Sequence, residues 1–132
     1  MKTIKIRRYI DTDFDRIQGL NREEGWSNLV EKNEDSKAAW ENSNVSFVAV
    51  TEDDEVVGYI RGLTDTCITL YICELLIDKK YRGLGIGKDL LQHVHQLYPK
   101  TRIEMLASST SHSFYEGLGY RPFYGFRKTL EE

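Results

Sequence analysis

The sequence predicts a mixed α/β (α+β) fold in which four helices flank a central sheet of about six strands. Segments rich in β-branched residues alternate with segments whose apolar residues recur at helical spacing. A chain of 132 residues can bury one core but not two substantial ones, so we expect residues 1–132 to form a single domain. The composition, 40% hydrophobic and 30% charged, is that of a globular protein.

The N-terminal third predicts one strand and two helices. The β-branched content of residues 3–10 predicts a strand, which Asp11-Thr12-Asp13 ends. A helix capped by Thr12 or Asp13 follows, with Phe14, Ile17 and Leu20 on one face. After a break at residues 21–28, residues 28–42 predict a second helix with a thin apolar face.

The middle of the chain predicts a three-strand meander. The apolar runs at residues 45–51 and 55–63 are joined by Glu52-Asp53-Asp54 and form an expected antiparallel hairpin. The run at 67–77 is almost continuously apolar, which is typical of a central strand buried on both faces.

The C-terminal part predicts a helix, a strand, a helix and a final strand. Apolar residues repeat at helical spacing from Gly85 until Pro99, and residues 101–107 read as a strand. A helix carrying Phe114, Tyr115 and Leu118 follows. The aromatic stretch 120–130 is the expected sixth strand.

Composition also excludes several classes of function. A formal charge of −3 argues against nucleic-acid binding, which needs a basic face. No apolar run approaches the roughly 20 residues that cross a bilayer, so we expect a cytoplasmic protein, monomeric or homodimeric, with no membrane partner. Cys67 and Cys73 lie too far apart in one strand to bridge, and His93 and His95 face different ways on a helix, so no metal site is expected.

The most informative stretch is the glycine-rich turn Arg82-Gly83-Leu84-Gly85-Ile86-Gly87-Lys88, which joins the central strand to a helix. Glycines let oxygen atoms of a ligand approach the main chain, and a helix N-terminus favours an anion. The spacing is not Gly-x-Gly-x-x-Gly, and Gly87-Lys88 is followed by Asp89 instead of the Ser or Thr of a P-loop. The turn therefore predicts a pyrophosphate cradle outside both common nucleotide motifs.

At this point the chain resembles the GNAT superfamily of acyl-CoA-dependent N-acetyltransferases. The turn at residues 82–87 resembles that family's Arg/Gln-x-x-Gly-x-Gly/Ala pyrophosphate loop. The segment Phe114-Tyr115-Glu116-Gly117-Leu118-Gly119-Tyr120 resembles the family's Phe-Tyr-Glu-Lys-Leu-Gly-Phe segment. Both motifs stand in the family's order, and the resemblance is weakest at residues 21–42.

The resemblance implies acetyl-CoA as co-substrate and no metal. Main-chain groups of Leu75 and Ile77 would pair with pantetheine, and an N–H near Leu75 or Leu76 would polarise the thioester carbonyl. The pyrophosphate would lie on the amides of the turn: Arg82, Gly83, Leu84, Gly85, Ile86, Gly87 and Lys88. Ser108 and Ser111 stand where the family often has Asn and Ala, and are candidate cofactor contacts.

Two residues are the candidate catalytic groups. Tyr115 matches the family's general acid, and a phenol can protonate a departing thiolate. Glu74, in an apolar strand, can be the base, directly or through water, or can pair with Arg61 or Arg102 as a structural ion pair. His112 is a weaker substitute base. Neither cysteine has an activating neighbour, so we expect direct attack in a ternary complex.

The acceptor is the least defined part of the prediction. Glu23, Glu24 and Trp26 form a loop that suits an amine, or else the tryptophan plugs the core edge and the carboxylates are solvated. An enzyme would acetylate a primary amine, either a small cationic molecule or a protein amino group. The alternatives are an acetyl-CoA sensor without turnover and a nucleotide-binding protein.

Overall fold

A five-stranded sheet forms the centre of the molecule. The computed structural model describes residues 3–130. The strands are β1 (Lys5–Arg8), β2 (Val45–Val50), β3 (Val56–Thr64), β4 (Thr69–Ile77) and β5 (Arg102–Met105), in the spatial order β1-β2-β3-β4-β5. Neighbours pair antiparallel from β1 to β4, and β5 pairs parallel with β4.

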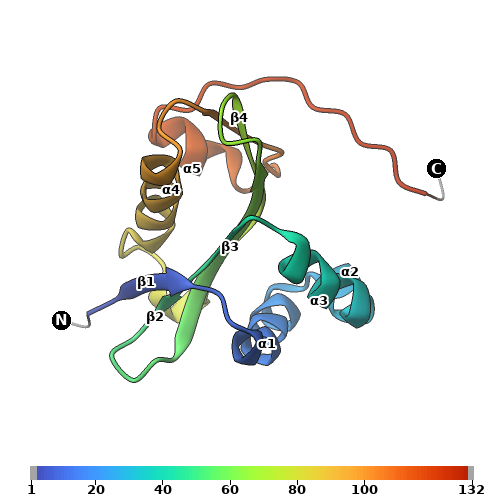
Figure 1. Ribbon diagram of the computed structural model, residues 1–132, viewed down its shortest axis with the longest axis vertical. Coiled ribbons are helices and arrows are strands. Elements are labelled where there is room, and N and C mark those ends of the chain that lie inside the picture. Colours follow the sequence, from blue (N-terminus) through green and yellow to red (C-terminus); the bar gives the residue numbers. More distant parts are fainter. Residues whose placement is uncertain (1–2, 131–132) are drawn as a thin grey trace.

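Helices cover both faces of this sheet (Figure 1). On one side lie α1 (Phe14–Glu24), α2 (Ser27–Glu31) and α3 (Asn33–Asn42), and on the other α4 (Ile86–Leu97) and α5 (His112–Gly117). Two short 3₁₀ turns, η1 (Asp11–Asp13) and η2 (Lys79–Tyr81), precede α1 and follow β4. No helix in the described range is long and apolar enough to span a bilayer.

Alternation along the strands produces two cores. In β2, Phe47 and Ala49 face the core under α4, whereas Val48 and Val50 face the core under α1 and α3. The first core is completed by Leu90 and Val94 of α4 among others, and both are fully buried. Because side chains alternate between the faces of a strand, a strand buried on both faces reads as a continuous apolar run.

The predicted mixed α+β architecture is confirmed, with two differences. The expected helix at 28–42 divides into α2 and α3 at Lys32, whose backbone (φ −90, ψ 52) leaves the helical region. The expected strand at 120–130 is wrong: the segment is extended but pairs with no strand within the described residues. Pro122 cannot donate a ladder hydrogen bond, and the aromatics that suggested a buried strand are exposed.

The C-terminal part of β4 follows a β-bulge and is not paired with β5. The ladder with β3 is irregular between Arg61 and Gly62, because Arg61 opposes Glu74 while Gly62 opposes Ile72. Cys73 is therefore the extra residue of a β-bulge. The parallel ladder with β5 ends at Ile72, so the last residues of β4 have an open edge where β5 has diverged.

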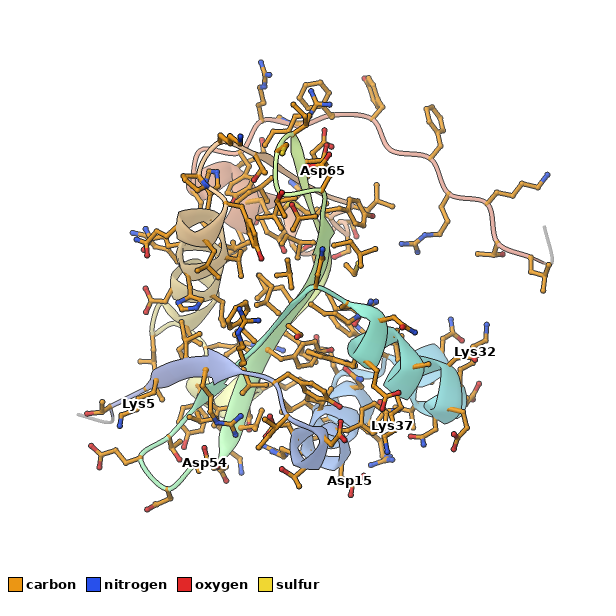
Figure 2. All side chains as sticks on the ribbon, viewed as in Figure 1. Lys5, Asp15, Lys32, Lys37, Asp54 and Asp65 are labelled. Atoms are coloured by element: carbon orange, nitrogen blue, oxygen red, sulfur yellow. The ribbon has the colours of Figure 1, made fainter. Side chains whose placement is uncertain are left out.

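Aspartate side chains stabilise the β3–β4 turn and the β2–β3 turn by hydrogen bonds. Asp65 accepts the main-chain amides of Cys67, Ile68 and Thr69 at 2.7 to 3.0 Å, which lowers the pKa of its carboxyl group. Asp54 ends the β2–β3 turn with a positive φ of 63° and accepts from Arg7 at 3.0 Å. Figure 2 labels both aspartates, at opposite ends of the long strands.

Candidate active site

The glycine-rich turn lies between η2 and α4. Asp78 caps η2 by accepting the amide of Lys80 at 3.0 Å. Gly83 and Gly85 then adopt φ values of +80° and +83°, in the left-handed region that side chains disfavour. Gly85 is the N-cap of α4. The chain thus reverses within a few residues and directs the start of α4 toward the end of β4.

The main-chain amides of residues 83–88 are free to bind a ligand. No hydrogen bond between described residues uses any of them, and the first main-chain donor of α4 to find an acceptor is Asp89, which donates to Gly85 at 2.9 Å. Consecutive free N–H groups at a helix N-terminus attract an anion. The predicted cradle residues therefore share the geometry of an anion site, to which exposed Lys88 adds a positive charge.

Arg82 is turned away from this row of amides. Its guanidinium donates to the main-chain oxygen of Ile77 at 3.0 Å and to the carboxylate of Glu24 at 2.5 Å. The side chain therefore links the turn to the C-terminal end of α1. Sequence patterns place Arg82 next to a phosphate, but they hold no information about a partner 58 positions away.

The open edge of β4 presents main-chain groups beside the turn. The amide of Asp78 donates to Val57 of β3 at 2.8 Å, so the N–H of Asp78 points toward β3. Because main-chain direction alternates along a strand, Leu75 and Ile77 direct their N–H and C=O groups to the opposite side, where β5 has diverged. Of these four groups, the C=O of Ile77 accepts Nε of Arg82 at 3.0 Å. Leu75 and Ile77 are two of the residues expected to pair with an extended ligand; Leu76 instead packs in the core under α1.

Gly87 brings α5 against the start of α4. A Cβ at Gly87 would lie 3.2 Å from Cζ of Phe114, closer than an ordinary van der Waals contact. This glycine has no positive φ, so its role in this structure is close packing of the two helices. The contact places α5, and with it Tyr115, on the same side of the sheet as the turn.

Tyr115 is half-buried on the α4 and α5 face. Its ring makes edge contacts with Phe114 and Tyr120, at centroid distances of 5.0 and 5.7 Å. Burial raises the pKa of the phenol to about 12, and the neighbouring Tyr120 adds to the effect. Its hydroxyl hydrogen-bonds to no other described residue, so the protonated phenol is free to donate.

Ser108 and Ser111 form one turn with Thr110 ahead of α5. The amide of Ser108 donates to Oγ of Ser111 at 3.0 Å, and the two hydroxyls lie 3.0 Å apart. Their hydroxyls are thus already engaged with each other. The turn is exposed and lies between β5 and α5.

Glu74 forms a bidentate ion pair with Arg61 across the β3–β4 ladder. Nε and Nη2 of Arg61 donate to its two carboxylate oxygens at 2.9 and 2.7 Å, and Nη1 donates to Ser43 at 3.1 Å. Both side chains are about 15% exposed. Of the two partners expected from the sequence, Arg61 is the one found; Arg102 instead lies 3.9 Å from Glu104.

Glu74 and Tyr115 lie on opposite faces of the sheet. Glu74 shares its face with Leu76, which packs under α1, whereas Tyr115 packs with Leu75 and Ile77 on the α4 side. A cavity of about 20 Å³, lined by Glu74, Arg61, Asn21 and Ser36 among others, touches the carboxylate. That volume is enough for one water molecule with several polar partners. The two candidate groups therefore lie on opposite sides of β4.

The predicted loop position of the acceptor residues is wrong for Glu23 and Glu24, because α1 continues to Glu24 and only Gly25 and Trp26 separate it from α2. Ion pairs join this end of α1 to the turn. Glu24 binds Arg82, and Glu23 lies 3.7 Å from Arg16, which itself binds Asp78 at 2.8 Å. Trp26 is half-buried and packs against the core under α1. The C-terminal end of α1 thus lies beside the cradle, but the carboxylates of Glu23 and Glu24 both have cationic neighbours. Arg16 and Asp78 were not singled out from the sequence, because charges 62 positions apart give no local pattern.

The remaining histidines and cysteines have structural surroundings. His93 makes an edge contact with Phe47, and Nε2 of His95 lies 3.0 Å from the main-chain oxygen of Thr101. His112 is 2.9 Å from Glu116, one turn along α5. Cys67 and Cys73 are free thiols. Among the described residues, no three His, Cys, Asp or Glu side chains form a metal-binding group.

Several known proteins to which this chain is similar are named as acetyltransferases. An uncharacterized N-acetyltransferase of Pyropia yezoensis is 29% identical over 93 residues, which cover 64% of this chain and 52% of that protein. The chain thus spans about half the length of the curated relative it matches. A GNAT-family acetyltransferase of Streptococcus pneumoniae superposes over the whole of both chains, with a TM-score of 0.78 and 22% identity.

A second solved structure with this fold contains coenzyme A. It is the aminoglycoside N-acetyltransferase AAC(6')-Iy in complex with CoA, which superposes with a TM-score of 0.74 and 16% identity over 97% of this chain and 96% of that chain. The sequence model of the acetyltransferase (GNAT) domain matches residues 12–128. That match covers most of the sequence and includes both motifs that carried the resemblance. The chain belongs to the acetyltransferase (GNAT) family.

Proposed function

We propose that this protein transfers an acetyl group from acetyl-CoA to a primary amine by direct attack in a ternary complex. The observation that carries the proposal is the row of free amides at residues 83–88, next to the open edge of β4. A pyrophosphate matches the amides, and an extended amide-containing chain matches the unpaired main-chain groups of Leu75 and the N–H of Ile77, whose C=O accepts from Arg82. Acetyl-CoA carries both chemical features.

The thioester would then lie in the gap between β4 and β5. A cofactor whose pyrophosphate lies at the turn and whose arm follows β4 backward brings its reactive end toward the bulge at Cys73. Tyr115 packs on the α4 and α5 face of the sheet, from which it would donate, and Glu74 lies on the other face. In this arrangement Tyr115 would protonate the departing sulfur from one side, and Glu74 would accept the proton of the attacking amine from the other.

The chemistry needs one proton donor and one proton acceptor. The amine lone pair attacks the carbonyl carbon, the new C–N bond forms, and the C–S bond breaks as electrons leave on sulfur. Tyr115 donates its phenol proton to the thiolate, and the raised pKa keeps that proton available at neutral pH. The amine's proton passes to Glu74 through a water molecule, because Arg61 occupies one direction of approach to each carboxylate oxygen.

The acceptor is proposed to be a small cationic amine or a protein amino group. Glu23, Glu24 and Trp26 lie beside the turn and supply negative charge and an aromatic face. The aminoglycoside acetyltransferase with the same fold is named for an amine acceptor, which agrees with this class. Ser108 and Ser111, whose hydroxyls bond to each other, are proposed only as outer contacts to the cofactor.

A transfer assay tests this function. Purified full-length protein is mixed with saturating acetyl-CoA and a panel of polyamines, aminoglycosides and lysine peptides, and CoA release is measured alongside the mass of the product. We expect at least one amine to accelerate CoA release with a matching acetylated product. Tight binding of acetyl-CoA with no release for any amine would instead support the sensor.

A further inference from the structure

A chain of buried polar side chains lies between the sheet and the helices α1 to α3, on the face that carries Glu74 (Figure 1). It begins at Tyr59 of β3, which is fully buried, and passes through Asn21 and Gln18 of α1, which are 3% and 4% exposed. It ends at the main-chain oxygen of Leu29 in α2. Because buried polar groups cost desolvation free energy that apolar side chains would not, packing alone does not account for this chain of contacts.

The main-chain oxygen of Leu29 fixes the direction of each hydrogen bond in the chain. A carbonyl oxygen can only accept, so Nε2 of Gln18 donates to it at 3.0 Å, and Oε1 of Gln18 faces Asn21. Oε1 can also only accept, so Nδ2 of Asn21 donates to it at 2.9 Å, and Oδ1 of Asn21 accepts from the hydroxyl of Tyr59. Burial raises the pKa of Tyr59 well above its ordinary value, which keeps this hydroxyl a donor. The amide of Asn21 is therefore held in one orientation.

Asn21 also lines the cavity of about 20 Å³ that touches Glu74. Gln18 uses one N–H of the Asn21 amide, and the other has no acceptor among residues 3–130. Ser36, which is 9% exposed and lines the same cavity, donates its hydroxyl hydrogen to a main-chain oxygen at 2.6 Å and so offers only lone pairs. Each carboxylate oxygen of Glu74 keeps a lone pair free beside its ion pair. The cavity thus offers one donor and two acceptors.

This set of groups matches a single water molecule. A water in the cavity would accept from Asn21 and donate to Ser36 and Glu74, and about three hydrogen bonds are typical of a buried water. Its second lone pair would stay free. An ammonium group matches less well, because it has no lone pair for the N–H of Asn21 and would lie beside the guanidinium of Arg61, which lines the same cavity.

We propose that Asn21 is a positioning residue of acetyl transfer, which holds, together with Ser36, the water molecule through which Glu74 takes the proton of the attacking amine. The amine's proton passes to the free lone pair of this water as one of the water's own protons passes to the carboxylate. The water is thereby regenerated, and Glu74 ends protonated. Tyr59 and Gln18 act through Asn21, because they keep one N–H of its amide free for the water. The inference rests on the proposed function, since it concerns the base of that reaction.

Two variants separate this role from a structural one. Asn21→Leu removes the N–H but also leaves the hydroxyl of Tyr59 without its acceptor, so we expect a lower melting temperature. Asn21→Leu/Tyr59→Phe removes both partners and should recover much of that loss. With the best amine of the panel above, kcat of the double variant should stay at least about ten-fold below the wild type, because the water is no longer held. The KM for acetyl-CoA should be unchanged.

Two further variants complete the kinetic test. Ser36→Ala leaves the bonds of Asn21 to Tyr59 and Gln18 in place but removes an acceptor of the water, so kcat should fall here as well. Asn33→Ala is the matched control. It removes a second acceptor of Gln18, at 3.0 Å, that does not line the cavity, and should leave kcat as in the wild type.

A high-resolution crystal structure tests the water directly. We expect one ordered water bonded to Asn21, Ser36 and Glu74 in the wild type and none in Asn21→Leu/Tyr59→Phe. A wild-type cavity without this water overturns the inference, whether or not the protein transfers acetyl groups. A double variant whose kcat returns together with its stability also overturns it, and leaves the proposed function standing. A wild type that transfers acetyl to no amine overturns the proposed function and this role of Asn21 with it.

Discussion

Arg61 of β3 holds both carboxylate oxygens of Glu74 of β4, directly beside the bulge at Cys73. Because both side chains are about 15% exposed, the pair is largely removed from water. An ion pair of this kind contributes little net stability, but the loss of one partner leaves the other charge uncompensated. The pair therefore maintains the shape of β4 at the point where the gap to β5 opens.

Removing one member of this pair should destabilise the protein. Arg61→Met leaves the Glu74 carboxylate without its partner, and we expect the free energy of unfolding to fall by about 3 kcal/mol or more. Urea denaturation followed by circular dichroism measures it. The double variant Arg61→Met/Glu74→Met should recover most of the loss. If the single variant is as stable as the wild type, the pair is not desolvated as the structure has it.

Tyr115→Phe should reduce acetyl transfer without affecting cofactor binding. Loss of a general acid typically costs about 10²-fold to 10⁴-fold in kcat, whereas the ring and its packing remain. Stopped-flow CoA release measures kcat, and calorimetry measures affinity for acetyl-CoA. Tyr120→Phe is the matched control, because it removes a neighbouring phenol at 5.7 Å and should leave kcat nearly unchanged. Equal effects of the two substitutions would remove the acid role from Tyr115.

The raised pKa of Tyr115 predicts how activity and stability change at alkaline pH. The folded pKa of about 12 lies above the ordinary value of 10, so the protonated phenol is favoured by folding. Its contribution to stability is fully present below pH 10 and is lost as the pH rises toward 12. We expect no loss of activity from this group near pH 9 to 10. If kcat falls between pH 9 and 10 in the wild type and this fall is absent in Tyr115→Phe, the pKa of Tyr115 is near the ordinary value of 10 instead.

Alanine at the turn glycines should weaken both stability and binding. Gly83 and Gly85 have φ values of +80° and +83°, and a Cβ in that region costs roughly 1 to 2 kcal/mol. We expect thermal denaturation to show the loss and calorimetry to show weaker acetyl-CoA binding, because the amides are reoriented. Gly19→Ala in α1 is the matched control: its Cβ would have only an ordinary contact at 3.8 Å, so it should stabilise slightly and bind normally.

Glu24→Gln should strengthen acetyl-CoA binding. Glu24 now holds the Arg82 guanidinium away from the amides of the turn, and the amide side chain of Gln would release that charge toward a phosphate. Titration at low and moderate salt should show a lower Kd for the variant and a steeper salt dependence. Arg82→Ala should bind more weakly than the wild type. If Glu24→Gln binds acetyl-CoA more weakly, the carboxylate does not compete for Arg82.

The sequence predicted the parts of the site that depend on local chemistry. Positive φ at Gly83 and Gly85 and the start of α4 follow from residue types within a short stretch. Partners such as Arg82 with Glu24 and Arg61 with Glu74 depend on the sheet register and on the packing of α1, which no local pattern encodes. Likewise, the aromatic content of residues 120–130 resembled a strand because composition does not show what covers a segment.

Calorimetric titration of the wild type with acetyl-CoA, ATP and NAD under identical salt tests most directly whether the free amides at residues 83–88 and the open edge of β4 form an acetyl-CoA site. All three ligands carry phosphates, but only acetyl-CoA has an extended arm for Leu75 and Ile77. We expect acetyl-CoA to bind at least about ten-fold more tightly than either nucleotide, since main-chain pairing adds to the phosphate contacts. Equal affinity for the three ligands, or tighter binding of ATP or NAD, would contradict the assignment.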